Sequence, residues 1–152
     1  MFRSHIVQCK DEEHIMTVQI DWPLSLNGSI NTWLHDPDGT APVDVVETGD
    51  RPEVHVQLNI SGAAAPLLNG QFTFKVAYEG IGGATVAEGE SASVVANLPG
   101  GQPSITIHRH VDLPNNLPPG AYKLVTLVSY NQNGWKKIAA FHEGPVIMVA
   151  DM

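Results

Sequence analysis

Apolar and polar side chains alternate along the stretch QFTFKVAYE, residues 71–79. Phe72, Phe74, Val76 and Tyr78 fall on one side of an extended chain, and the residues between them fall on the other. A period of two over this length is typical of a β-strand with one buried face and one face toward water. The stretch therefore predicts a strand in a sheet that packs against a second layer.

The same alternation recurs along the chain, and no window of about ten residues combines helical periodicity with capping residues. Residues 53–61 give the clearest second example, with Val54 and Val56 pointing one way and His55 and Gln57 the other. Turn residues recur about every 8–12 residues, which is typical of a sandwich or barrel. The other predicted strands are 14–22, 30–34, 43–46, 84–88, 91–98, 103–113, 121–131 and 135–150. The pattern predicts an all-β, antiparallel β-sandwich of about 7–9 strands.

A length of 152 residues indicates one domain, large enough to bury a core without a disulfide or a metal. Residues 1–35 add strand material beyond what a seven-strand sandwich needs. We expect residues 36–152 to form the sandwich and residues 1–35 to be an N-terminal extension, with one or more extra strands packing on it.

The segment LPPGAYKLVTLV, residues 117–128, resembles the entry into the F strand of immunoglobulin-like sandwiches. Tyr122 lies where that fold has its tyrosine corner, a buried ring whose hydroxyl bonds back to the preceding loop. Residues 136–149 resemble the final G strand, and the tail is similar to small bacterial sandwich proteins. The resemblance covers residues 40–150 and implies an immunoglobulin-like sandwich, without implying an activity.

The chain departs from antibody-type domains at their hallmark positions. Leu124 stands where the second disulfide cysteine would be, and Val56 or Leu58 stands where the first would be. The predicted third strand offers Phe72 and Phe74 in place of the core tryptophan. The resemblance therefore extends to the fold alone.

The formal net charge of −8, with only eight lysine and arginine residues, argues against nucleic-acid and anionic-membrane partners. No stretch approaches the roughly 18 apolar residues of a membrane-spanning helix. Cys9 is the single cysteine and the first residues lack an apolar run, so neither a disulfide framework nor a signal peptide is predicted. We expect a cytoplasmic, bacterial protein.

No sequence motif predicts a catalytic centre. The chain has no Gly-x-Ser-x-Gly elbow, and the glycines at 80–83 are not followed by a phosphate-loop lysine. We therefore predict no enzymatic activity and no cofactor. A hydrolase with a site assembled from distant residues is the least favoured alternative.

Seven histidines make metal binding an open alternative. His108 and His110 have the i, i+2 spacing that projects both rings from one face of a strand. Two neutral imidazoles on one face bind zinc or copper when a third ligand reaches them. His55 and His142 lie on other predicted strands, and either one is a candidate for that third ligand. Cys9 lies at the wrong end of the chain for a blue-copper site.

The three tryptophans, Trp22, Trp33 and Trp135, form a second candidate ligand site. Aromatic side chains gathered on a sandwich surface would favour carbohydrate binding. Packing in the core or at a sheet edge is the competing interpretation.

The last two predicted strands are apolar on both faces, whereas antiparallel sheets normally keep one face polar. The outer set lies within residues 121–149 and consists of Val125, Leu127, Phe141, Ile147 and Val149. Either strand 14–22 folds back over this face, or a second copy or another protein covers it. The favoured function is therefore a non-enzymatic interaction or assembly module that self-associates or binds a protein partner here. Gly144-Pro145 interrupts the last strand and predicts a bulge or a strand switch, which would re-aim residues 146–149. Arg109 falls on the apolar side of its strand, which predicts a strand end, a bulge or a buried acidic partner.

Overall fold

The protein is a β-sandwich in a computed structural model that describes residues 4–10, 15–21, 26–35, 45–82 and 87–151. Side chains are described for 26–34, 45–82 and 87–151. The described part contains eleven strands and one short 3₁₀ helix, η1 (Ala65–Leu67). None of its helices is long and apolar enough to cross a membrane. The predicted all-β sandwich is thus confirmed.

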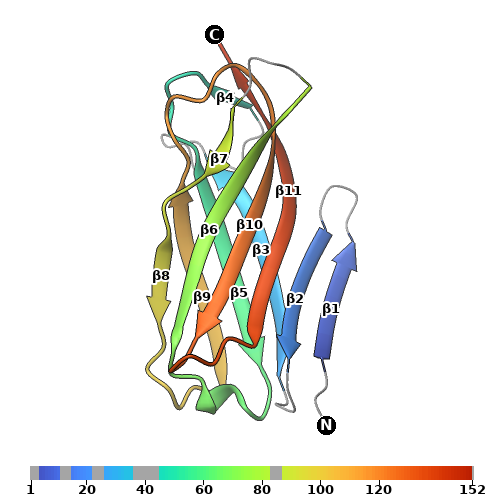
Figure 1. Ribbon diagram of the computed structural model, residues 1–152, viewed down its shortest axis with the longest axis vertical. Helices are drawn as coiled ribbons and strands as arrows, with labels where there is room; N and C mark the ends of the chain where they lie inside the picture. Colours follow the sequence, from blue (N-terminus) through green and yellow to red (C-terminus); the bar gives the residue numbers. More distant parts are fainter. Residues whose placement is uncertain (1–3, 11–14, 22–25, 36–44, 83–86, 152) are drawn as a thin grey trace.

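The larger sheet has eight strands and runs in the order β1-β2-β11-β10-β6-β7, with β4 also pairing with β11 and β8 with β6. Its strands are β1 (Ser4–Lys10), β2 (Ile15–Asp21), β4 (Val45–Glu47), β6 (Gln71–Ile81), β7 (Glu88–Glu90), β8 (Val94–Asn97), β10 (Gly120–Asn131) and β11 (Ile138–Ala150). All pairings are antiparallel except the one between β4 and β11. Figure 1 shows β1 and β2 standing beside β11, so these two strands extend the sheet sideways.

The smaller sheet has three strands in the order β3-β5-β9 and lies behind the larger one in Figure 1. Its strands are β3 (Asn27–His35), β5 (Glu53–Ser61) and β9 (Ser104–Asp112), all antiparallel. The central strand, β5, alternates as predicted: Val54, Val56 and Leu58 face the larger sheet and are fully buried. The opposite face of this sheet is the outer surface on which the candidate site lies.

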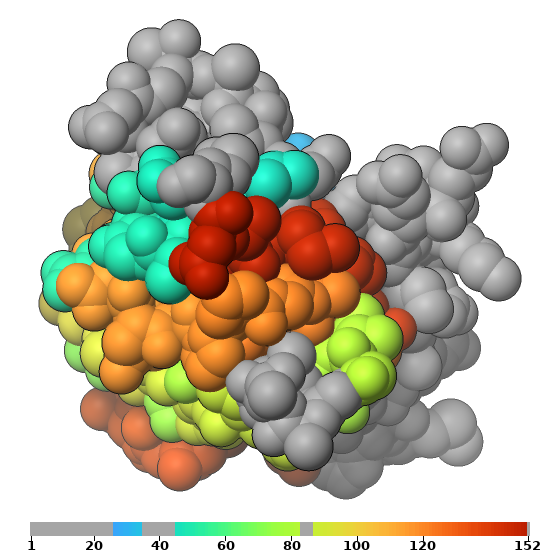
Figure 2. Space-filling model, turned by 90° about the horizontal axis from the view of Figure 1, so that it is seen from above, coloured from blue at the N-terminus to red at the C-terminus, as the bar shows by residue number. Residues whose placement is uncertain are grey.

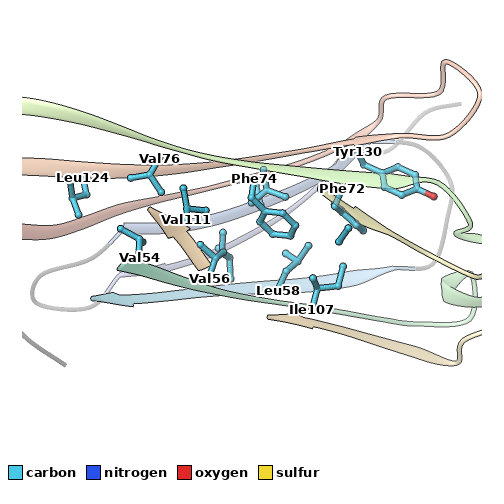
Figure 3. Packing of buried hydrophobic residues seen from close by; sticks show 14 of the residues in the cluster. Val54, Val56, Leu58, Phe72, Phe74, Val76, Ile107, Val111, Leu124 and Tyr130 are labelled. Atoms are coloured by element: carbon cyan, nitrogen blue, oxygen red, sulfur yellow. The ribbon is translucent and has the colours of Figure 1, made fainter. Parts of the chain in front are cut away.

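The core fills the space between the two sheets (Figure 3). Phe72 and Phe74 of β6 project from the larger sheet toward Leu58 and Ile107 of the smaller one. The rings of Phe72 and Tyr130 are in contact, with centroids 4.7 Å apart. Because aromatic and branched side chains alternate inward on both sheets, the long strands β6, β9 and β10 each keep one parity facing the core.

In β11 the buried parity changes once, at a bulge. Lys123 pairs with Val146 and Val125 pairs with Glu143, so β10 advances two residues while β11 advances three. The extra residue inverts the two faces of β11 beyond Gly144. Ile147 and Val149, which the sequence pattern placed on the outer surface, therefore face the core at 1% and 3% exposure.

Tyr122 forms the loop-to-strand contact expected of a tyrosine corner. Its side chain is fully buried, and its hydroxyl donates a hydrogen bond of 2.6 Å to the carbonyl oxygen of Pro118. The loop before β10 is thereby tied to the end of the sandwich, where it lies beside Val46 and the last residues of β11 (Figure 2). This contact fixes where the long strand β10 begins.

Arg109 lies on the inward-facing side of β9, and the strand continues past it to Asp112. Its Nε donates to the carbonyl oxygen of Val95 on β8 at 3.4 Å, and an Nη donates to the His108 carbonyl at 2.9 Å. Since β9 is an edge strand of the smaller sheet, the long side chain reaches across the sandwich edge to a backbone acceptor. Of the three alternatives predicted for Arg109, a strand end and a bulge are excluded by the unbroken register of β9 with β5, and the partners that the structure describes are carbonyl oxygens in place of a buried acid.

Candidate metal centre

The candidate site lies on the outer face of the smaller sheet. Its residues alternate along the strands with the residues that are buried on the inner face. Val54 and Val56 of β5 face the core. Side chains alternate along a strand, so Glu53, which precedes Val54, and His55, which lies between the two valines, point to the outer face. In β9, Ile107 is buried on the inner face, so the alternation places His108 and His110 on the outer face. The antiparallel register places His55 directly opposite His110.

Three ligand-type atoms converge at this point. Glu53 Oε2 lies 3.5 Å from His55 Nε2 and 3.9 Å from His110 Nδ1. One such atom from each of the three side chains lies within 4.8 Å of the other two. The rings of His55 and His110 stack nearly parallel, with centroids 4.6 Å apart and 24° between their planes.

His108 and Trp33 enclose His55 from the remaining sides. His55 Nδ1 and His108 Nε2 are joined by a hydrogen bond of 2.9 Å. Trp33 of β3, the register partner of His55, stacks on the His55 ring with centroids 5.5 Å apart and contacts the His108 ring at 5.3 Å. His55 is therefore held between β3 and β9 by aromatic contacts on both sides.

Burial within the cluster is uneven. The His55 side chain is 9% exposed, whereas Glu53 is 34% and His110 is 58% exposed. A buried histidine thus forms the floor of the site, and a carboxylate and a second imidazole rise beside it toward solvent. An ion at this position would have one open side for water or another small ligand.

The donor set and spacing fit a zinc-type ion. Bond lengths of about 2.0–2.2 Å to tetrahedral zinc place neighbouring ligand atoms about 3.3–3.6 Å apart. The distances of 3.5 and 3.9 Å from Glu53 Oε2 are close to that value. Because the His55 and His110 rings stack, the exposed His110 ring would have to turn out of the stack for both nitrogen lone pairs to reach one ion. Two imidazoles and one carboxylate suit first-row transition ions, whereas calcium and magnesium prefer oxygen ligands alone.

The structure brings together the three histidines named from the sequence, His55, His108 and His110, and adds Glu53. Sequence spacing alone did not single out Glu53, although Glu53 and His55 have the same i, i+2 spacing as His108 and His110. The alternative third ligand, His142, lies instead in the core at 3% exposure, where its Nδ1 is hydrogen-bonded to the Thr32 hydroxyl.

The tryptophans do not form a shared platform within the described part of the chain. Trp33 lies against the histidines, whereas Trp135 follows β10 and packs edge-on against Tyr130 of the larger sheet, with centroids 6.0 Å apart. Trp22 lies outside the described residues. Trp33 therefore belongs to the histidine cluster.

The outer face of β10 and β11 retains part of the apolar set named from the sequence. Leu127 is 40% exposed and Phe141 is 36% exposed, while Val125 is half-buried. Leu127 and Phe141 line a groove of about 540 Å³, whose other lining residues are Thr73, Lys75, Ser93, Val128, Ser129, Ala139 and Ala140. Ile147 and Val149 are absent from this surface because of the bulge in β11.

Comparisons with known proteins give no family. No protein-family model matches the chain, and no curated protein matches it. Among solved structures, the chain is similar to the crystal structure of the PmoD soluble domain from Methylocystis sp. ATCC 49242. That match has 9% sequence identity and a TM-score of 0.35, and covers 84% of this chain and 98% of the other. At this level of similarity we infer nothing about function.

Proposed function

We propose that this protein binds one first-row divalent metal ion, of which zinc is the representative, through Glu53, His55 and His110. The proposal rests on one observation, the convergence of these three side chains to within 4.8 Å on adjacent antiparallel strands. Two imidazole nitrogens and a carboxylate oxygen make a ligand set that proteins use for zinc.

The ion would be a bound ligand and not a structural element of the fold. The sandwich buries a continuous hydrophobic core between its sheets, and the cluster lies on the far side of the smaller sheet from that core. A chain of this size is stable without a metal when its core is of this kind. Three protein ligands leave one position of a tetrahedral ion to water, which favours exchange. The proposal is one of binding, without catalysis.

The first test is a zinc titration of metal-free protein against a chromophoric chelator. We expect one zinc per chain, and a loss of affinity of at least about 10–100-fold in Glu53→Gln, because the variant lacks a carboxylate ligand. Asp112→Asn is the matched control. Asp112 pairs with Glu53 across β5 and β9 and is exposed, but it lies outside the cluster.

The control separates coordination from general attraction of cations to a chain of net charge −8. If both variants weakened zinc binding equally, the ion would be held by charge alone and the proposed site would be excluded. Absence of stoichiometric binding by the unmodified chain would overturn the proposed function altogether.

We also propose a second function, self-association through the groove beside Leu127 and Phe141. The supporting observation is the exposure of these two large side chains beside a groove whose lining residues include no carboxylate. Among the described residues that line the groove, Lys75 alone is charged, and it is paired with Glu90 at 3.3 Å. Two copies of the chain would meet there face to face with that charge already partnered. Light scattering coupled to size exclusion would show a dimer that Leu127→Lys converts to a monomer. A single-chain mass for the unmodified protein at micromolar concentration would exclude this function.

A further inference from the structure

The two nitrogens of His55 face different partners. Nε2 points toward Glu53 Oε2 at 3.5 Å, within the group of three ligand atoms. Nδ1 lies 2.9 Å from His108 Nε2, at hydrogen-bond distance. One ring therefore connects the proposed ligand group with a histidine that contributes no atom to it.

The hydrogen bond between these rings has two polarities, and only one is compatible with a metal ion. A nitrogen–nitrogen hydrogen bond holds one hydrogen, so one ring donates and the other accepts. If His108 donates, the hydrogen of neutral His55 sits on Nε2 and blocks the lone pair that would bind the ion. If His55 donates from Nδ1, the lone pair of Nε2 is directed at the ligand group.

Resting on the proposed function, we infer that His108 is a positioning residue for the metal and not one of its ligands. His108 Nε2 accepts the hydrogen of His55 Nδ1, which fixes the tautomer of His55 and the orientation of its ring. The N–H of the second ring nitrogen of a metal-bound histidine generally donates a hydrogen bond to such a partner, which is most often a carboxylate or a carbonyl group. Here a neutral imidazole has that role.

Packing supports this assignment. Trp33 contacts both rings, at 5.5 Å from His55 and 5.3 Å from His108, so it holds the hydrogen-bonded pair together on the sheet. His108 Nε2 faces Nδ1 of His55, the nitrogen on the far side of the ring from Glu53. An ion bound at Nε2 of His55 would therefore meet Glu53 and His110, with His108 behind the His55 ring.

The experiment compares His108→Ala, His108→Gln and His110→Ala with the unmodified chain. Zinc affinity is measured by chelator competition, and the coordination sphere is measured from the visible spectrum of bound Co²⁺. His108→Ala is expected to weaken zinc binding about 10–100-fold, in line with the loss of a partner behind a ligand. Its Co²⁺ spectrum should keep the band positions and intensities of the unmodified protein.

His108→Gln supplies a carbonyl oxygen that can accept the same hydrogen, so it should recover most of the affinity. His110→Ala is the ligand control, because it should alter the Co²⁺ spectrum as well as the affinity. Melting curves of the metal-free variants check that each one folds. Nitrogen-15 NMR of the zinc-loaded protein should show the His55 hydrogen on Nδ1.

Two results would overturn the inference while leaving the proposed function intact. Unchanged zinc affinity in His108→Ala would show that the hydrogen bond has no part in binding. A Co²⁺ spectrum altered in the same way as that of His110→Ala would make His108 a ligand. Failure of the unmodified chain to bind zinc or Co²⁺ would overturn the proposed function itself, and this inference with it.

Discussion

His55 and His110 lie directly opposite each other on β5 and β9, with their rings stacked 4.6 Å apart on the outer face of the smaller sheet. Their alignment depends on the core on the other face. Val54 pairs with Val111 in the same register, and both side chains are fully buried. Because a slip of one residue would expose these valines, burial of the core sets the geometry of the histidine cluster.

The tryptophan beside the cluster should report metal binding. Zinc places positive charge next to the His55 ring on which Trp33 stacks, so the emission of this indole should change as the ion binds. We expect Trp33→Phe to abolish the zinc-dependent change in fluorescence. Trp135→Phe should preserve it, since Trp135 packs against Tyr130 on the other sheet. An undiminished response in Trp33→Phe would place the ion elsewhere.

The tyrosine corner should make a measurable contribution to stability. Tyr122→Phe keeps the buried ring and removes the hydroxyl, which donates to the Pro118 carbonyl at 2.6 Å and accepts a longer bond of 3.4 Å from the Ala87 backbone N–H. Unfolding should therefore become easier by about 1 kcal/mol. Equilibrium urea unfolding at neutral pH measures the difference. Equal unfolding midpoints for the two proteins would mean that the loop before β10 is held by other contacts.

The bulge in β11 predicts opposite responses from adjacent residues. Ile147 is buried at 1% exposure, so Ile147→Ala should lower the free energy of unfolding by about 2–5 kcal/mol. Met148 is 46% exposed, and Met148→Ala should change it by no more than about 0.5 kcal/mol. Denaturant unfolding of the pair tests the parity change. A larger loss of free energy of unfolding in Met148→Ala than in Ile147→Ala would show that the faces of β11 do not change at the bulge.

Tyr130 should make stability fall at alkaline pH. Burial raises the pKa of Tyr130 above its ordinary value of 10.0, against the lowering effect of hydrogen bonds from the backbone of Gly70 and Asn69. As pH rises through about 10, the phenol of the unfolded chain loses its proton first, so the folded chain binds more protons and unfolding is favoured. The contribution is complete below that pH and is lost as pH rises toward the folded-state pKa.

Urea unfolding at pH 9, 10 and 11 measures this effect, with Tyr130→Phe as the comparison. The unmodified chain should lose stability more steeply than the variant over this range. Parallel curves for the two proteins would show that the Tyr130 phenol has the same pKa in the folded and unfolded states.

The strands could be predicted from the sequence because burial on one face imposes a period of two. The predicted strand 53–61 matches β5, and the predicted strands 71–79 and 103–113 differ from β6 and β9 by one or two residues at their ends. Tyr122 was placed correctly for the same local reason, since the loop and strand that define its contact are adjacent in the chain.

Features that depend on which strands pair could not be predicted. Gly144-Pro145 indicated an irregularity in the last strand, but the inward position of Ile147 follows only from the register between β10 and β11. Glu53 and His110 lie far apart in the sequence and meet only because β5 pairs with β9. The i, i+2 spacing of His108 and His110 pointed to one face, but the hydrogen bond that gives His108 a different role depends on the position of His55.

The most direct test of metal binding is the location of a bound ion. Crystals of the zinc-loaded protein, with anomalous data collected at the zinc absorption edge, should show one peak about 2.0–2.2 Å from Glu53 Oε2, His55 Nε2 and His110 Nδ1. His108 should lie behind His55, outside bonding distance of the ion. A peak bound by His108 and His110 alone, or no peak at this sheet face in zinc-loaded crystals, would contradict the account.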